Sequence, residues 1–219
     1  MGATKIMVIR HAEKPGFYED NDKAHYYGVD EFGMVSGVAG AKHLVTLGWE
    51  RAGALITLFT PPYGPKTPLA TPKFLFASDP DAKADDDTGD EAPSQRPHET
   101  LLALKAKLNL PHIDHQYSKS EIAEMVTAAL ACDGAVLIAW QHEDIPLKAK
   151  TKTGRGISAE ILTQTKTTGT FNVPASWPVG PAGARYDLVF VFDRPTGRGP
   201  ITGFTLVPQQ LLKCDLPNI

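Results

Sequence analysis

The chain has 219 residues, of which 42% are hydrophobic and 21% are charged, and its formal net charge is −3. This length and composition favour a single globular domain over residues 1–219 and exclude a wholly disordered chain. The small negative charge gives no general attraction to nucleic acid, and no apolar run approaches the roughly 20 residues of a membrane-spanning helix. We therefore expect neither nucleic acid nor a membrane as a partner.

Strands and helices are predicted to alternate along most of the chain, before two final strands. The strands are short runs of β-branched and aromatic residues, and the helices carry hydrophobic residues at helical spacing. In chain order we predict a strand at 4–10, a helix at 46–59, a strand at 74–77, a helix at 98–108 opened by Pro97, a strand near Ile113, a helix from the capping box Ser118–Glu121 to about Cys132, and strands at 135–140, 186–192 and 201–207.

This alternation is typical of a mostly parallel sheet with helices on both faces. The last two predicted strands flank a turn at 193–200 (DRPTGRGP), so we predict an antiparallel hairpin at one edge of the sheet. The sequence therefore predicts an α/β protein with three layers, an α/β/α sandwich.

Two segments exceed the usual length of a connecting loop. Residues 79–95 carry seven acidic residues against one basic residue, which is typical of a solvated insertion. Residues 165–185 are rich in Gly, Pro and Thr and include Trp177. The two cysteines do not make a disulfide framework, and the apolar run at 6–9 is too short for the core of a signal peptide, so we expect a cytoplasmic protein.

Two of the predicted buried strands run directly into a histidine. The first strand ends in Arg10, His11 follows it, and Glu13 comes two residues later. The strand at 135–140 is followed by His142 and Glu143. Because ligands of open α/β sheets bind beyond the carboxyl ends of the strands, we predict that the two histidines belong to one site.

These motifs resemble, in the same order, those of the histidine phosphatase superfamily, which is also called phosphoglycerate mutase-like. Residues 10–13 (RHAE) look like its Arg-His-Gly-Glu signature, and residues 46–55 (TLGWERAGAL) are similar to a helix of the family. Ser78 with residues 96–100 (RPHET) resembles its Ser-to-Arg block, and residues 140–142 (WQH) stand where the family has its second histidine. The resemblance implies a phosphoglycerate mutase-like fold.

The resemblance covers about residues 4–150 and includes departures from the family pattern. Ala12 stands where the family has Gly, and Glu143 stands where Gly usually follows the second histidine. The acidic segment 79–95 separates the serine from Arg96, whereas only a few residues separate the two in the family. We assign Arg96 to this block because the residues that follow it are expected to open a helix.

The resemblance implies a phosphoryl-transfer site with a covalent intermediate. His11 is the implied nucleophile and would form a phosphohistidine, since a neutral imidazole nitrogen is competent to attack phosphorus. The guanidiniums of Arg10 and Arg96 can each grip two phosphoryl oxygens in a planar fork, and protonated His142 would donate to the same oxygens. Glu143 is our choice for the acid that protonates the leaving alcohol.

Two other carboxylates stay open as the proton donor. Asp144 has an alternative role as a helix cap, because a helix start is predicted just before Pro146. Glu13 is expected to orient the arginine or histidine side chains, and we assign both Glu13 and Lys14 to substrate binding. The sequence has no glycine-rich nucleotide loop and no convincing set of metal ligands, so we expect neither a cofactor nor a metal.

The predicted function is metal-independent hydrolysis of a small phosphomonoester through a phosphohistidine on His11. One alternative is a phosphoglycerate mutase-type phosphotransferase, which would return the phosphoryl group to a second hydroxyl. The other alternative is a phosphate-binding or interaction module on the same fold, without turnover.

Overall fold

The computed structural model describes residues 2–15, 28–33, 42–82, 94–149, 154–181 and 183–217. Most of the predicted acidic insertion, residues 83–93, lies outside the described residues. In the described part of the chain, no helix combines the length and the apolar character needed to cross a membrane.

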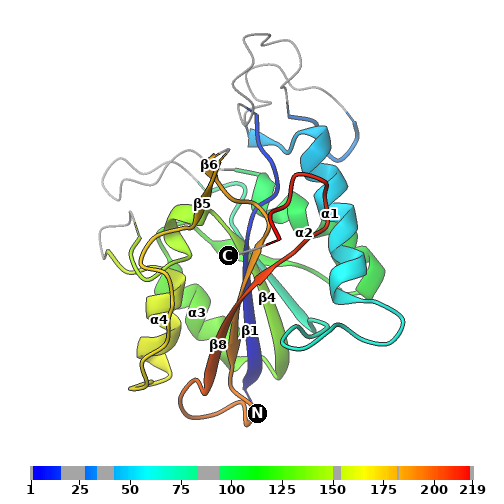
Figure 1. The fold of residues 1–219 in the computed structure, drawn as a ribbon. Helices are drawn as coiled ribbons and strands as arrows, with labels where there is room; N and C mark the ends of the chain where they lie inside the picture. Colours follow the sequence, from blue (N-terminus) through cyan, green and yellow to red (C-terminus); the bar gives the residue numbers. More distant parts are fainter. Residues whose placement is uncertain are drawn as a thin grey trace.

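A mixed sheet of six strands forms the centre of the fold, with the order β3-β2-β4-β1-β7-β8 (Figure 1). β3, β2, β4 and β1 run parallel to one another, whereas β7 is antiparallel to both of its neighbours, β1 and β8. The prediction of a mostly parallel sheet with an antiparallel hairpin at its edge is confirmed. The strands are β1 (Ala3–Arg10), β2 (Phe74–Ser78), β3 (Asp114–Tyr117), β4 (Gly134–Trp140), β7 (Leu188–Asp193) and β8 (Gly203–Pro208).

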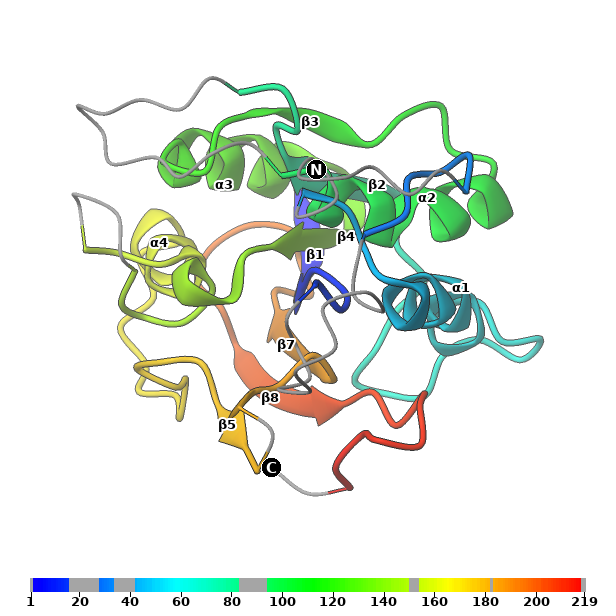
Figure 2. The ribbon, with the colours of Figure 1, turned by 90° about the horizontal axis from the view of Figure 1, so that it is seen from above.

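Helices cover both faces of this sheet. α1 (Thr46–Phe59) and α2 (Arg96–Leu108) lie on one face, and α3 (Ile122–Ala131) and α4 (Ile157–Gln164) lie on the other (Figure 2). The α/β class with helices on both faces therefore agrees with the prediction. A separate two-stranded sheet pairs β5 (Val179–Gly180) with β6 (Gly183–Ala184).

Alternating side chains of the central strands build a hydrophobic core on each face. In β1, Ile6 and Val8 pack with residues of α3 and α4, while Met7 and Ile9 pack with residues of α1 and α2. All four side chains are fully buried. Each one contributes about 1.5–3 kcal/mol of hydrophobic free energy, so the ends of the central strands are firmly fixed.

The structure differs from the prediction around two helices. The box Ser118–Glu121 forms a turn before α3, which begins only at Ile122. The Glu121 carboxylate accepts the backbone N–H of Ser118 at 2.8 Å, but the Ser118 hydroxyl contacts that of Ser120 and caps no helical N–H. α4 was not predicted, because its two turns give too short a hydrophobic pattern.

The connections that leave β1 and β4 run in opposite directions across the sheet. From β1 the chain passes to α1 on one face, and from β4 it passes toward α4 on the other face (Figure 2). In open α/β sheets such a reversal leaves a crevice at the carboxyl ends of the two strands, where ligands bind. The sheet topology thus indicates that a ligand would bind just beyond Arg10 and Trp140.

Candidate active site

The two neighbouring strands place the predicted histidines at one cavity. β1 and β4 pair with Arg10 beside Trp140, and the backbone N–H of His11 donates to the Trp140 carbonyl at 2.9 Å. Directly after β4, a 3-10 helix, η3 (His142–Asp144), begins at His142. His11 and His142 line the same cavity of about 30 Å³, which we call the histidine cavity.

Loops that follow three parallel strands, together with the start of α2, form the walls of the histidine cavity. Lys14 follows β1, Lys119 follows β3, and Arg96 begins α2. These three cations outnumber the one carboxylate of the lining, that of Glu143, so the cavity favours an anion. The lining residues are His11, Lys14, Ser94, Arg96, Pro97, Lys119, Gln141, His142 and Glu143.

His11 is held as a neutral imidazole. Its residue is only 4% exposed, and its Nδ1 lies 2.7 Å from the carbonyl of Ala12. Burial, together with the charges of Arg96 and Arg10, lowers the pKa of His11 well below its ordinary value. With the Nδ1 proton donated to that carbonyl, Nε2 keeps its lone pair, which is the state a nucleophile requires.

The Arg10 guanidinium packs against the Tyr186 ring. The guanidinium carbon lies 3.6 Å from the centre of the Tyr186 ring, and Nη1 donates to the carbonyls of Ala184 and Arg185, the latter at 3.2 Å. Burial lowers the pKa of Arg10 to about 10, so the group stays charged at neutral pH. Arg10 adjoins His11 without lining the histidine cavity, and its contribution to an anion is the charge and the remaining N–H groups.

Buried polar atoms without a hydrogen-bond partner gather at the carboxyl edge of the sheet. Within the described residues there are five such side-chain atoms. Such atoms are rare in folded proteins and often mark a functional site. All five belong to the last residue of a parallel strand or to the two residues after β4: Arg10 Nε, Ser78 Oγ, Trp140 Nε1, Gln141 Oε1 and His142 Nδ1.

The first turn of α2 fixes Arg96 beside the loop of His11. Thr100 donates through its hydroxyl to the Arg96 carbonyl at 2.7 Å and accepts the backbone N–H of Ala12 at 2.8 Å. The Nε of Arg96 donates to the hydroxyl of Ser94 at 2.9 Å. Arg96 thus reaches the histidine cavity despite its long separation from Ser78 in the sequence.

His142 and Glu143 form a partly exposed pair on the wall of the histidine cavity. Nδ1 of His142 lies 3.1 Å from Oε2 of Glu143, outside hydrogen-bonding orientation, and the two side chains are 17% and 30% exposed. The His142 ring meets Trp177 edge-on, with 6.3 Å between ring centres. A carboxyl group at this position can exchange protons with solvent and with a bound ligand.

Asp144 has a different environment from Glu143. It is 3% exposed and accepts a hydrogen bond from the side-chain amide of Gln141. The predicted helix start after Asp144 is wrong: η3 ends there, and the next helix, α4, begins only at Ile157. Before α4 the chain instead makes a backbone bridge between Lys148 and Arg155.

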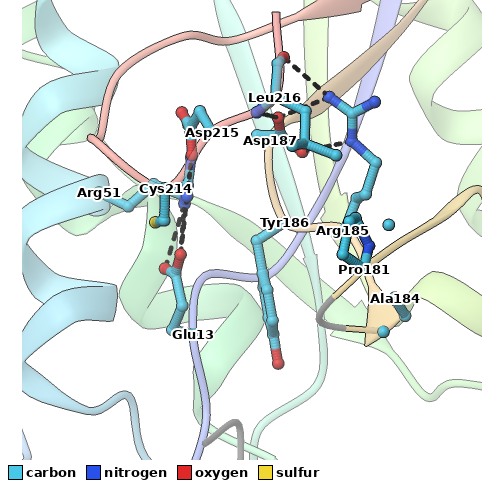
Figure 3. A pocket seen from close by; sticks show the side chains of 12 residues that line it. Glu13, Arg51, Pro181, Ala184, Arg185, Tyr186, Asp187, Cys214, Asp215 and Leu216 are labelled. Carbon is cyan, nitrogen blue, oxygen red and sulfur yellow. Dashed lines mark hydrogen bonds and ion pairs between the residues drawn. The ribbon is translucent and has the colours of Figure 1, made fainter. Parts of the chain in front are cut away.

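Glu13 is not among the residues that line the histidine cavity. It is 1% exposed, and both of its oxygens accept hydrogen bonds from Arg51 of α1, the shortest at 2.7 Å (Figure 3). Arg51 also binds the carboxylate of Asp215, with Nη2 to Oδ1 at 2.6 Å. The predicted role of Glu13 in binding substrate therefore has no support from its position, because the buried network engages its carboxylate.

Lys119 and Gln141 line the histidine cavity but were not predicted as site residues. The capping pattern around Lys119 accounted for it as part of a helix start. Its position directly beyond β3 was nevertheless an available signal, since β3 ends at the same edge of the sheet as the other parallel strands. Lys119 is 8% exposed, which is rare for a lysine away from a site or a partner.

Comparisons with known proteins add no identification. No protein-family model matches the chain, and no curated protein matches it. The functional assignment therefore depends on the geometry described above.

Proposed function

We propose that the chain is a metal-independent phosphomonoester hydrolase that acts on a small phosphorylated substrate through a phosphohistidine at His11. The observation that carries this proposal is the convergence of a neutral, buried imidazole with three cations and a carboxylate on one cavity. We also propose that the fold is phosphoglycerate mutase-like, as the order of the sequence motifs implies.

In the first step, Nε2 of His11 attacks the phosphorus atom and the bond to the ester oxygen breaks. The transferring group carries its negative charge on three oxygens, which fixed cations stabilise. Arg96, Lys14 and Lys119, which line the cavity, supply these charges. Arg10 adds a further positive charge behind His11.

The leaving alcohol requires a proton, and Glu143 is the best-placed donor. Its carboxyl lines the histidine cavity beside His142, whereas neither Asp144 nor Glu13 lines that cavity. In the second step Glu143, now ionised, removes a proton from water, and the resulting oxygen nucleophile attacks the phosphohistidine. Phosphate leaves, and His11 returns to its neutral form.

A phosphate-binding module without turnover is the second candidate. The observation that favours it is the engagement of Arg10, whose Nη1 donates to two backbone carbonyls and so leaves fewer N–H groups for a phosphoryl group. In this case the cavity would hold phosphate, but no covalent adduct would form.

Hydrolysis of an aryl phosphate such as p-nitrophenyl phosphate, in the presence of a chelator, tests the proposal. We expect turnover by the wild-type chain and its loss in His11→Ala. His112→Ala is the matched control, because His112 is exposed and lies outside the histidine cavity. Vanadate binding without turnover would favour the binding module, and the absence of both would contradict a phosphate site altogether.

A further inference from the structure

A second cavity, larger than the histidine cavity, has Tyr186 in its lining. Its volume is about 210 Å³, and its lining joins β5, β6 and the C-terminal segment 214–216 (Figure 3). We call it the tyrosine cavity. An apolar cavity of about 150 Å³ is large enough to hold benzene, so this one has room for a somewhat larger ring system.

The charges around the tyrosine cavity neutralise one another. Arg51 pairs with Glu13 and with Asp215, and Arg185 pairs with Asp187 at 2.6 Å. Figure 3 shows the Tyr186 ring between these two groups of ion pairs. Because these charges already have partners, a charged ligand would gain little here and would lose its hydration.

The rest of the lining is apolar and includes the aromatic residue Tyr186. Gly180, Pro181, Ala184 and Leu216 line the cavity together with Tyr186. Apolar walls around a cavity of this volume favour a small, neutral ring system, since such a molecule loses little hydration on burial.

The tyrosine cavity shares its wall with the anchor of Arg10. The Tyr186 ring lies under the Arg10 guanidinium, and the carbonyls of Ala184 and Arg185 accept hydrogen bonds from Arg10 Nη1. All three of these partners line the tyrosine cavity. A ligand that packs against this wall would hold Arg10 more firmly next to His11.

We propose that the tyrosine cavity binds a small, neutral aromatic molecule and that its binding strengthens anion binding at the histidine cavity through Tyr186 and Arg10. The site itself is independent of the proposed function, whereas the coupling rests on it. Coupling between two sites is reciprocal, so bound phosphate would strengthen the binding of the aromatic molecule by the same factor.

Cys214 provides a reporter for the first part of the proposal. It is exposed and lines the tyrosine cavity, so a bound molecule would shield its thiol. In a Cys132→Ser background only Cys214 reacts, and we expect indole to slow its alkylation by iodoacetamide in a saturable way. Unchanged alkylation at saturating indole would overturn the site.

Two tryptophan variants locate the shielding. Leu216→Trp fills the tyrosine cavity but keeps the backbone bonds of residue 216, and we expect it to abolish the indole effect. Val179→Trp is the matched control, since Val179 is 75% exposed and lies outside the cavity lining. Gly180→Ala is a second test of the location. The added Cβ would lie 2.9 Å from Leu216 Cδ1 and would displace the Leu216 side chain within the cavity. Equal protection in all three variants would overturn the location.

Phosphate binding with and without indole tests the coupling. We expect indole to lower the Kd for inorganic phosphate by about fivefold, and Leu216→Trp to remove this response. An unchanged or weaker affinity would overturn the coupling. If phosphate does not bind at all, the proposed function fails, while the indole protection of Cys214 still tests the tyrosine cavity.

Discussion

The environment of His11 favours the neutral form of its imidazole. Burial and the neighbouring guanidiniums of Arg96 and Arg10 all act in the same direction and lower its pKa. A lowered pKa keeps the imidazole neutral, so in the proposed reaction the same cations that would bind the phosphoryl group also keep His11 in the form that can attack it.

Arg96→Gln tests this double role. We expect kcat/KM to fall about 100-fold, because a donor to the developing charge is lost. The acidic limb of the pH–rate profile should also move to higher pH, since removal of the Arg96 charge lets the pKa of His11 rise. Lys107→Gln, on the exposed side of the same helix, should change neither quantity. A lower rate with an unmoved acidic limb would contradict the electrostatic account of His11.

Glu143→Gln tests the assignment of the proton donor. A phosphate ester with a poor leaving group needs the proton and should react far more slowly, whereas an activated aryl ester should lose much less in its first step. Asp144→Asn should leave this dependence on the leaving group unchanged, because its carboxylate binds Gln141. Equal losses for both esters in Glu143→Gln would exclude Glu143 as the donor.

The residues of the site were partly predictable from the sequence. The rule that sites follow the carboxyl ends of strands paired His11 with His142, and the expected helix start located Arg96. The ion pair of Glu13 with Arg51 was not predicted, because Arg51 lies on a helix far along the chain and nothing local reveals a buried ion pair. Lys119 was missed because a local capping pattern already explained its neighbours.

Among the elements, α1 positions the loop of His11 through a close backbone contact. At Gly48 an added Cβ would lie 2.6 Å from the carbonyl oxygen of Glu13. Only glycine allows this approach, and the contact sets the distance between α1 and the chain that leaves β1. The same helix contains Gly53, where an added Cβ would meet no atom within 4 Å.

These two glycines form a matched pair of tests. Gly53→Ala should raise the free energy of unfolding by about 1 kcal/mol, because alanine favours the helix. Gly48→Ala should lower it by about 1–3 kcal/mol, as expected for overpacking, and should reduce turnover by displacing the loop of His11. Urea unfolding and the aryl phosphate assay give both quantities. Stabilisation by both substitutions would contradict the close contact.

Helices with a strong local sequence pattern were predicted, and those with a weak pattern were not. α1 has the predicted bounds because its hydrophobic spacing is regular over 14 residues. α4 has only eight residues, and tertiary packing of Ile157 and Ile161 stabilises it. Its N-cap, Gly156, is required because a Cβ there would lie 1.9 Å from the Pro146 carbonyl, a contact that no local pattern encodes.

At the scale of the whole molecule, buried ion pairs join distant parts of the chain. Arg51 connects the loop after β1, through Glu13, to the C-terminal segment, through Asp215. Although burial acts in the opposite direction, the hydrogen bonds and charge of Arg51 lower the pKa of Asp215. The ionised form of Asp215 therefore contributes to stability above its unfolded pKa, and this contribution is lost as the pH falls through its folded pKa.

Asp215→Asn should lower the free energy of unfolding by about 2 kcal/mol at pH 7, because charge-assisted hydrogen bonds to Arg51 are lost. The difference from the wild-type chain should shrink at acid pH, where Asp215 is protonated in both folded and unfolded chains. Thermal unfolding across this pH range measures the effect. A constant difference at all pH values would show that the charge of Asp215 contributes nothing.

The central claim is that His11 carries the phosphoryl group, and trapping of the intermediate tests it most directly. Rapid mixing with an aryl phosphate, an alkaline quench and mass spectrometry of the digested chain should locate a phosphoryl adduct on His11. The adduct should be lost in acid, be absent from His11→Ala and accumulate in Glu143→Gln, which lacks the base for the second step. Turnover without an adduct, or an adduct on another residue, would contradict the account.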